Sequence, residues 1–111
     1  MRKLRQLNIR TVIPNGGEKH AVKDQWPPRS YTGKYVLASR VLTRVVVGEI
    51  YVEEYIPGKT PTTTIRRAGS GFVQHPDVVY AIGSVYGGAE TISFSHVPIN
   101  PLFITQPDEN E

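Results

Sequence analysis

The 111-residue chain contains no cysteine, which excludes disulfide bonds, a thiolate nucleophile and a cysteine-based zinc site. It also lacks any apolar run close to the roughly 20 residues that span a bilayer. The basic start, residues 1–5, is not followed by the apolar segment of a signal peptide, because Asn8 and Arg10 interrupt it. We therefore expect no membrane association, no secretion by a signal peptide, and a cytoplasmic or virion-associated location.

Positive charge is missing from the second part of the chain. All 13 Lys and Arg residues lie within residues 2–67, where five acidic residues leave a net charge of +8. Residues 68–111 contain five acidic residues and no Lys or Arg, a net charge of −5. This asymmetry favours either a polyanionic partner for the basic part or complementary contact between the two parts, within one chain or between copies.

Helix-forming patterns are scarce as well. Alanine is rare, β-branched residues are abundant, and Pro or Gly interrupts most windows of helical length. Short alternating segments with turn residues between them predict an all-β fold with little or no helix, a small sandwich or barrel of seven to nine short, mostly antiparallel strands. We expect a single β-domain over residues 1–111, with a basic N-terminal arm (residues 1–5) and an acidic C-terminal tail (residues 107–111).

The run over residues 41–56 is too long for one straight strand in a domain of this size, at ~3.3 Å per residue. Gly48 is the permissive residue inside it. We predict a type II′ hairpin at Gly48-Glu49, in preference to a bent strand with a bulge at Gly48.

Residues 78–86 and 89–97 predict a second hairpin through Gly87-Gly88. One face of this hairpin carries small residues opposite large ones and is expected to be the interior, with Ala81, Ile92 and Phe94 pointing inward. The reverse face is half polar and is expected to meet solvent or a partner; it carries Tyr80, Ile82, Ser84 and Tyr86 against Thr91, Ser93 and Ser95.

Residues 15–30 are polar and end in Trp26 and two prolines, which predicts the longest irregular stretch of the chain. A strand is expected to follow over residues 31–39. Irregular segments of this length are more often functional or mobile than inert.

Catalytic and metal-binding patterns are absent from the sequence. Residues 58–60 resemble the end of a P-loop and residues 69–71 resemble half of a nucleophile elbow, but both lack the remaining glycines and the helix that should follow. The three histidines, His20, His75 and His96, show no ligand spacing. We therefore predict no catalytic residues, no metal, no cofactor and no enzymatic activity. An enzyme or small-ligand carrier would require a concave pocket of roughly several hundred Å³.

Without catalytic motifs, the charge asymmetry favours a non-enzymatic protein-binding or self-assembling β module, with itself or another protein as partner. By analogy, extended charged termini around a compact β-core are typical of accessory or structural proteins of phage or virus type. The candidate protein-interface residues are aromatic: Trp26, Tyr80 and Tyr86.

The alternative is a small β-barrel that binds single-stranded nucleic acid. Basic grooves with aromatic platforms serve this purpose in such barrels, and the basic part of this chain contains both residue types. The candidate nucleic-acid-binding residues are Arg2, Lys3, Arg5, Arg10, Arg40, Arg44, Arg66, Arg67, Tyr51 and Tyr55.

Overall fold

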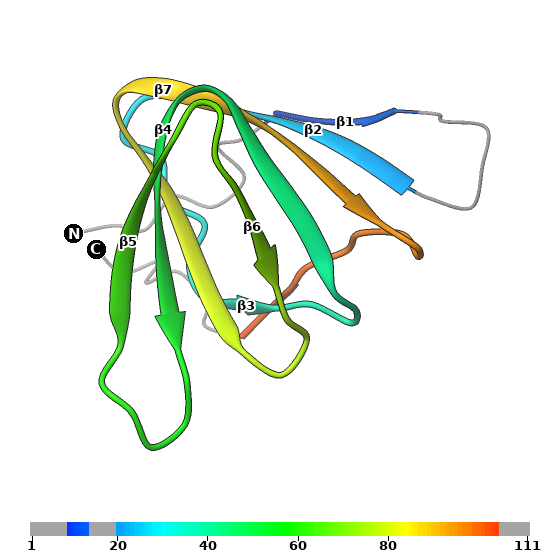
Figure 1. Ribbon diagram of the computed structural model, residues 1–111, viewed down its shortest axis with the longest axis vertical. Helices are drawn as coiled ribbons and strands as arrows, with labels where there is room; N and C mark the ends of the chain where they lie inside the picture. The colour runs from blue at the N-terminus through cyan, green and yellow to red at the C-terminus, as the bar shows by residue number, and fades with distance from the viewer. Residues whose placement is uncertain (1–8, 14–19, 105–111) are drawn as a thin grey trace, which may run out of the picture.

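The computed structural model describes residues 9–13 and 20–104, with side chains described for residues 20–104. This part of the chain is all β-structure, and it contains no helix long and apolar enough to cross a membrane (Figure 1). Its strands are β1 (Ile9–Ile13), β2 (His20–Trp26), β3 (Tyr35–Val36), β4 (Val41–Tyr55), β5 (Thr62–Arg67), β6 (Gly71–Gln74), β7 (Val79–Ser95) and β8 (Leu102–Phe103).

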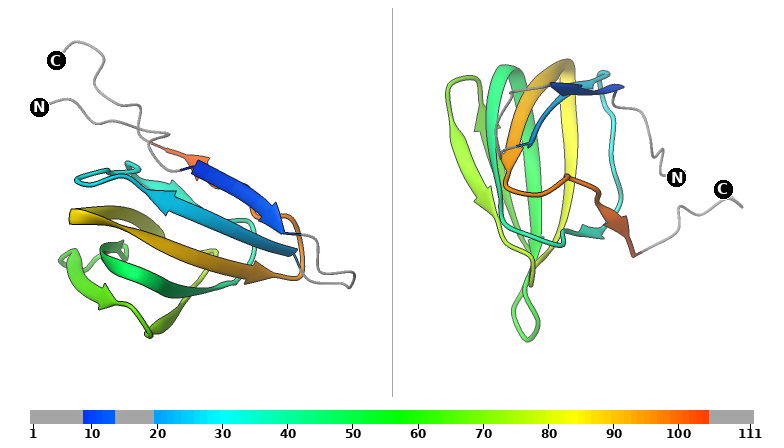
Figure 2. Two further views of the ribbon diagram at one scale, coloured as in Figure 1. Left: turned by 90° about the horizontal axis from the view of Figure 1, so that it is seen from above. Right: turned by 90° about the vertical axis from the view of Figure 1, so that its right-hand side faces the viewer.

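All strand pairs are antiparallel, and the two longest strands, β4 and β7, bend midway along their length (Figures 1 and 2). The first half of β4 pairs with β6 and with the second half of β7, which in turn pairs with β2 and, through it, β1. We call this region the first sheet. The second half of β4 pairs with β5 and with the first half of β7, which pairs with β3 and, through it, β8. We call this region the second sheet.

The two sheets fold over one another and enclose the core, which confirms the expected small all-β sandwich or barrel. Val41 and Val45 from the first sheet and Ile50, Val52 and Tyr80 from the second are all buried there. Two of the eight strands, β4 and β7, are long rather than short, because each contributes to both sheets. The basic arm and the acidic tail lie outside the described residues.

The bend of β4 lies at Gly48, which pairs with Ala89 of β7. Gly48 and Gly88 have φ angles of +76° and +75°, a region that L side chains rarely adopt. A Cβ at Gly48 would lie 2.2 Å from the carbonyl oxygen of Gly88, and the register shifts on either side of Gly48. The predicted hairpin at Gly48-Glu49 is therefore wrong, and the bent strand with a bulge is the structure that forms.

The hairpin predicted at Gly87-Gly88 is also wrong, since β7 continues through both glycines from Val79 to Ser95. The positive φ of Gly88 bends β7 against β4 and does not reverse the direction of the chain. A Cβ at Gly88 would lie 2.7 Å from the carbonyl oxygen of Trp26, so a third strand, β2, is packed closely at the same corner.

In the second half of β7 the two faces are exchanged relative to the prediction, whereas in its first half residues of both faces are buried. Tyr80 is 1% exposed, and Thr91 and Ser93 are buried with it, whereas Phe94 is 36% exposed. Ala81 is buried, as predicted. Hydroxyl groups are tolerated inside because they are hydrogen-bonded; for example, the Ser93 and Thr43 hydroxyls are 2.9 Å apart.

Part of the predicted irregular stretch is strand β2. It pairs with β7 over its whole length, from His20 opposite Ser95 to Trp26 opposite Ala89. The strand expected over residues 31–39 is reduced to the two residues of β3. This arrangement moves Trp26 from a surface loop into the interior.

Replacing Gly48 by Ala should destabilise the protein more than replacing Gly58, which has a similar φ of +79°. At Gly58 no atom lies within 4 Å of the added Cβ, so Gly58→Ala should cost only the backbone strain of about 1–2 kcal/mol. Gly48→Ala adds the collision with Gly88 and should cost about 1–3 kcal/mol more. Urea unfolding of both variants measures the difference, and equal losses would show that the corner is not closely packed.

Candidate ligand cavity

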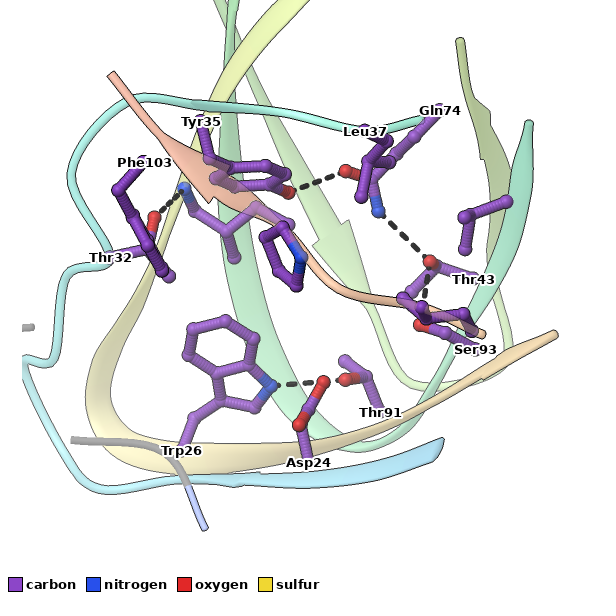
Figure 3. Close-up of a pocket in the computed structure, with 14 residues that line it drawn as sticks. Asp24, Trp26, Thr32, Tyr35, Leu37, Thr43, Gln74, Thr91, Ser93 and Phe103 are labelled. Carbon is purple, nitrogen blue, oxygen red and sulfur yellow. Dashed lines mark hydrogen bonds between the residues drawn. The ribbon is translucent and has the colours of Figure 1, made fainter. Parts of the chain in front are cut away.

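A cavity of about 250 Å³ lies between the two sheets (Figure 3). Polar side chains of the first sheet form one side of it, which we call the polar wall: Asp24, Thr43, Gln74, Thr91 and Ser93. The opposite side, the apolar wall, comes from the second sheet and the segments beside it: Leu37, Ile82, Ile99, Pro101 and Phe103. A molecule in this cavity would therefore meet hydrogen-bonding groups on one side and hydrocarbon on the other.

A chain of hydrogen bonds fixes one end of the polar wall. The Tyr35 hydroxyl donates to Gln74 Oε1, and Gln74 Nε2 donates to Thr43 Oγ1 over 3.0 Å. Thr43 Oγ1 is 2.9 Å from Ser93 Oγ. Four separate strands supply these residues, so the network holds the side chains in place and links the two sheets across the cavity.

The other end of the polar wall contains Trp26, Thr91 and Asp24. Trp26 Nε1 donates to Thr91 Oγ1 over 3.0 Å, which satisfies the buried indole N–H. Asp24 is 4% exposed and lies directly opposite Thr91 in the β2–β7 register. Asp24 provides the single carboxyl group among the described lining residues, and none of those residues is His, Cys, Lys or Arg.

These residues do not fit a metal ion. Across residues 20–104 there is no group of three or more His, Cys, Asp or Glu side chains that could hold one. Metal sites in proteins require several oxygen, nitrogen or sulfur ligands around the ion, and one carboxyl group with hydroxyl neighbours does not supply them. The donor set of this cavity is therefore suited to hydrogen bonding and proton exchange.

The sequence matches no protein family and no curated protein. The structure, however, is similar to solved enzymes of the cupin, or jelly-roll, type. It matches oxalate oxidase in complex with glycolate with a TM-score of 0.74 at 16% identity, over 88% of this chain and 55% of that one. It matches oxalate decarboxylase of Bacillus subtilis with a TM-score of 0.71 at 11% identity, over 85% of this chain and 26% of that one.

These comparisons establish the fold, and the chain spans about half the length of the oxidase and a quarter of the decarboxylase. They overturn the functional prediction. The expected non-enzymatic assembly module of phage or virus type, its nucleic-acid-binding alternative and the expected lack of enzymatic activity are all wrong, because the similar structures are enzymes. The cavity supplies the concave pocket that the sequence analysis set as the requirement for an enzyme or ligand carrier.

None of the four basic candidates whose side chains are described lines the cavity. Arg2, Lys3, Arg5 and the side chain of Arg10 lie outside the described residues, and the side chains of the other four point elsewhere. Arg40, Arg44 and Arg67 are exposed on the outside of the barrel, while Arg66 stacks over the ring of Phe72.

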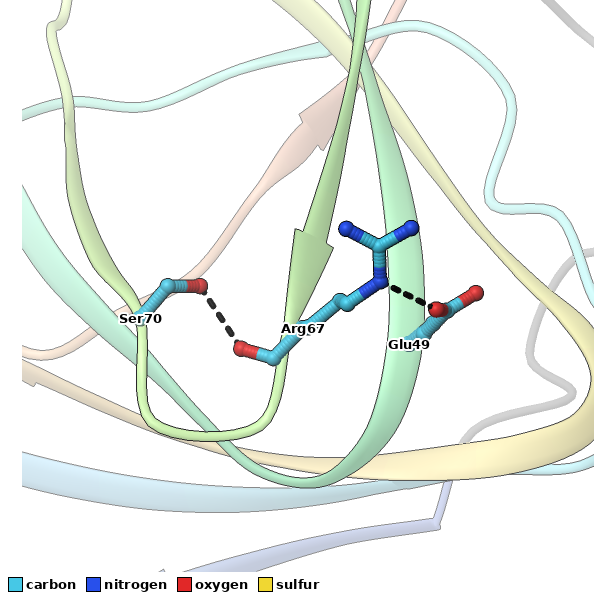
Figure 4. A network of polar contacts seen from close by, with 3 residues as sticks. All are labelled: Glu49, Arg67 and Ser70. Atoms are coloured by element: carbon cyan, nitrogen blue, oxygen red, sulfur yellow. Dashed lines mark hydrogen bonds and ion pairs between the residues drawn. The ribbon is translucent and has the colours of Figure 1, made fainter.

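Arg67 contacts two neighbouring residues on the surface, Glu49 and Ser70. Its Nε lies 2.6 Å from Glu49 Oε2, and its carbonyl oxygen accepts a hydrogen bond of 2.7 Å from the Ser70 hydroxyl (Figure 4). An exposed pair of this kind contributes little to stability, about 0–1 kcal/mol.

The three aromatic interface candidates differ in exposure: two are buried and one is exposed. Trp26 lines the cavity and Tyr80 is buried in the core, where its hydroxyl accepts a hydrogen bond from the backbone N–H of His75. Burial leaves neither side chain available to a protein partner. Tyr86 is 79% exposed and carries the Arg29 guanidinium 4.9 Å from its ring centre.

The nucleic-acid candidates Tyr51 and Tyr55 belong to a tyrosine cluster around Glu53. The hydroxyls of Tyr31 and Tyr55 both donate to Glu53 Oε1, over 2.9 and 2.8 Å, and Tyr51 stacks on Tyr31. Burial raises the pKa of Tyr31, Tyr51 and Tyr55, and the negative charge of Glu53 raises each pKa further.

Because of this cluster, the free energy of unfolding should depend on pH in the alkaline range. In the unfolded chain these tyrosines lose their protons near the ordinary pKa of 10.0, whereas the folded protein retains them. The contribution of this cluster to stability should therefore be constant below about pH 9 and be lost as the pH rises above about 10 toward the folded-state pKa values.

Glu53→Gln removes the charge that raises these pKa values, so this variant should lose less stability between about pH 9 and 11 than the natural protein. Urea unfolding across this range measures the loss. Glu49→Gln is the control, because Glu49 contacts Arg67 and no tyrosine of the cluster, and it should retain the full alkaline loss. An identical loss in the Glu53 and Glu49 variants would contradict the assignment.

Proposed function

We propose that this protein binds a small organic molecule in the cavity between its sheets and acts on it by proton transfer. The observation that supports the proposal is the composition of the cavity: a single carboxyl group and several hydroxyl groups on the polar wall, opposite a wall of hydrocarbon. Ligand sites in proteins have this character, mostly apolar with a few convergent polar groups.

The polar wall provides the groups that such chemistry requires. Asp24 can accept or return a proton at a bound molecule, which is the role of a general base or acid. The Thr91 and Ser93 hydroxyls can orient an oxygen of that molecule and stabilise negative charge that develops on it. Asp24, Thr91 and Ser93 are buried, and burial strengthens each of these interactions.

The chemistry proposed differs from that of the similar enzymes. Those enzymes are an oxalate oxidase and an oxalate decarboxylase, and the decarboxylase has Mn(II) centres. The described part of this chain has no cluster of ligands for such an ion, and a similarity at 11% and 16% identity indicates a shared fold and not a shared substrate. We therefore do not transfer either the metal or the substrate to this protein.

Trp26 provides a direct test, because it is the single tryptophan of the chain and lines the cavity. We expect members of a panel of small polyols, aldehydes, amides, hydroxy acids and amines to change its fluorescence and to raise the melting temperature, as binding to the folded state requires. Ile99→Phe, which places extra volume in the cavity without removing a polar group, should abolish both responses.

The matched control is Ile65→Phe, which makes the same replacement at an exposed position of β5 and should leave binding unchanged. Binding that persists in Ile99→Phe, or a panel in which no compound alters either signal, would refute the proposed function.

Added Mn(II) should not raise the melting temperature, because the described residues offer no cluster of ligands for it. The natural protein and Asp24→Asn should respond alike. A rise in melting temperature with Mn(II) that disappears in Asp24→Asn would show that the cavity holds the metal after all.

A further inference from the structure

We infer that the cavity binds a carbonyl compound, whose C=O oxygen accepts a hydrogen bond from the hydroxyl pair of Thr43 and Ser93. This inference rests on the proposed function, since it assumes that the cavity is a ligand site. It follows from the hydroxyl protons and acceptor atoms at this end of the polar wall. The charge and the partners of Asp24, at the other end, have no part in it.

The amide group of Gln74 faces the hydroxyl pair with a donor. Gln74 Oε1 accepts from the Tyr35 hydroxyl, and Gln74 Nε2 donates to Thr43 Oγ1 over 3.0 Å (Figure 3). An amide nitrogen is a donor and accepts no hydrogen bond. The protons of the Thr43 and Ser93 hydroxyls must therefore find their acceptors elsewhere.

The hydroxyl pair has one proton more than it uses. Its two oxygen atoms are 2.9 Å apart, so one hydroxyl donates to the other, and either residue can be the donor. Among the described residues, the bond from Gln74 is the one other hydrogen bond to this pair. Thr43 and Ser93 are 2% and 6% exposed, and both line the cavity. The remaining proton is therefore available to a molecule in the cavity, whichever residue carries it.

A carbonyl oxygen matches this proton in both arrangements, because it accepts hydrogen bonds and brings no proton of its own. A ligand hydroxyl needs an acceptor as well. When Thr43 donates to Ser93, each of the three oxygen atoms at this end already accepts a hydrogen bond: Gln74 Oε1, Thr43 Oγ1 and Ser93 Oγ. An ammonium group has donors alone and cannot accept the proton. The donors at this end therefore favour a C=O group.

The apolar wall fits the remainder of such a molecule. Leu37, Ile82 and Phe103 contribute hydrocarbon on the side of the cavity opposite the polar wall. The cavity of about 250 Å³ lies just below the usual size of ligand pockets, roughly 300–1,000 Å³. We therefore expect a compact carbonyl compound, with its oxygen toward Thr43 and Ser93 and its hydrocarbon body toward the apolar wall.

The first test compares two compounds with the same six-membered ring: cyclohexanone, which accepts hydrogen bonds alone, and cyclohexanol, which also donates. Calorimetric titration and the melting temperature report their binding to the full chain. Cyclohexanone should bind at least about threefold more tightly than cyclohexanol. Ile99→Phe should abolish the binding of both compounds, which would locate it in the cavity.

The infrared spectrum of bound cyclohexanone tests the hydrogen bond directly, without a variant. Donation to the C=O oxygen weakens the C=O bond, so its stretching band should lie at lower frequency than in a hydrocarbon solvent. A band at the hydrocarbon position would show that the ketone accepts no hydrogen bond in the cavity, and this would overturn the inference.

Two variants of Gln74 test whether the proton comes from the hydroxyl pair. Gln74→Glu, at about pH 8 and far above the ordinary Glu pKa of about 4.3, faces Thr43 with an acceptor and takes up the remaining proton. The preference for cyclohexanone should then fall to about twofold or less. Gln74→Leu supplies neither donor nor acceptor and should keep more of the preference than Gln74→Glu.

The matched control is Ser95→Ala. Ser95 is buried on the same strand, two residues after Ser93, but it is not among the described residues that line the cavity. This variant should bind both compounds as the natural protein does. A preference that Gln74→Glu retains in full, or that Ser95→Ala loses, would contradict the assignment of the proton to Thr43 and Ser93.

The outcomes distinguish this inference from the proposed function. Cyclohexanol binding as tightly as cyclohexanone would overturn the ligand class while leaving the cavity as a ligand site. A panel in which polyols or amines bind and no carbonyl compound does would have the same consequence. No binding by any compound, with Ile99→Phe indistinguishable from the natural protein, would overturn both.

Discussion

The shape of the barrel depends on one close contact, where the backbones of β4 and β7 meet at Gly48 and Gly88. Both residues have positive φ, and a side chain on Gly48 would collide with the carbonyl of Gly88. Because the two strands bend together, their pairing continues from one sheet into the other. In a simple sandwich each strand would belong to one sheet. Here the bent pair of β4 and β7 belongs to both sheets, and the bend sets the angle at which the two sheets enclose the cavity.

That bend also explains why polar residues lie inside. Strand β7 brings Thr91 and Ser93 to the interior of the first sheet after passing the corner, opposite Asp24 of β2 and beside Thr43 of β4. Burying hydroxyl and amide groups without partners would cost about 1–3 kcal/mol each, and the Tyr35–Gln74–Thr43–Ser93 chain removes that cost. The same bonds fix the hydroxyls in position, so the interactions that make the polar wall stable also orient it toward a ligand.

The sequence was sufficient to predict the fold class but not the site. Alternation with a period of two correctly identified extended strands and placed Ala81 inside, where it is buried. It failed for Phe94, which is partly exposed although it is apolar. It also failed for Ser93, which is buried although a polar residue is normally assigned to solvent. What makes Ser93 an interior residue is Thr43, 50 positions earlier, and what makes Gly48 a bend is the carbonyl of Gly88. Such long-range partners leave no local pattern. The row of alternating hydroxyl residues at Thr91, Ser93 and Ser95 is the available sequence signal of a polar interior, whereas the sequence analysis assigns this face to solvent or a partner.

The fold that this chain shares with the oxalate enzymes does not by itself determine the chemistry. The positions that line the interior are set by the bent strands and the packing between the sheets, whereas the reaction depends on which side chains occupy them. In this chain the described interior positions carry hydroxyl, amide and hydrocarbon groups and a single carboxyl group. Under the proposed function, the fixed hydrogen-bond donors among these groups would polarise the substrate. Fixed donors are effective when they are oriented before the substrate arrives and are shielded from water. Burial of Thr91 and Ser93, and the bonds that hold their oxygen atoms, meet both conditions.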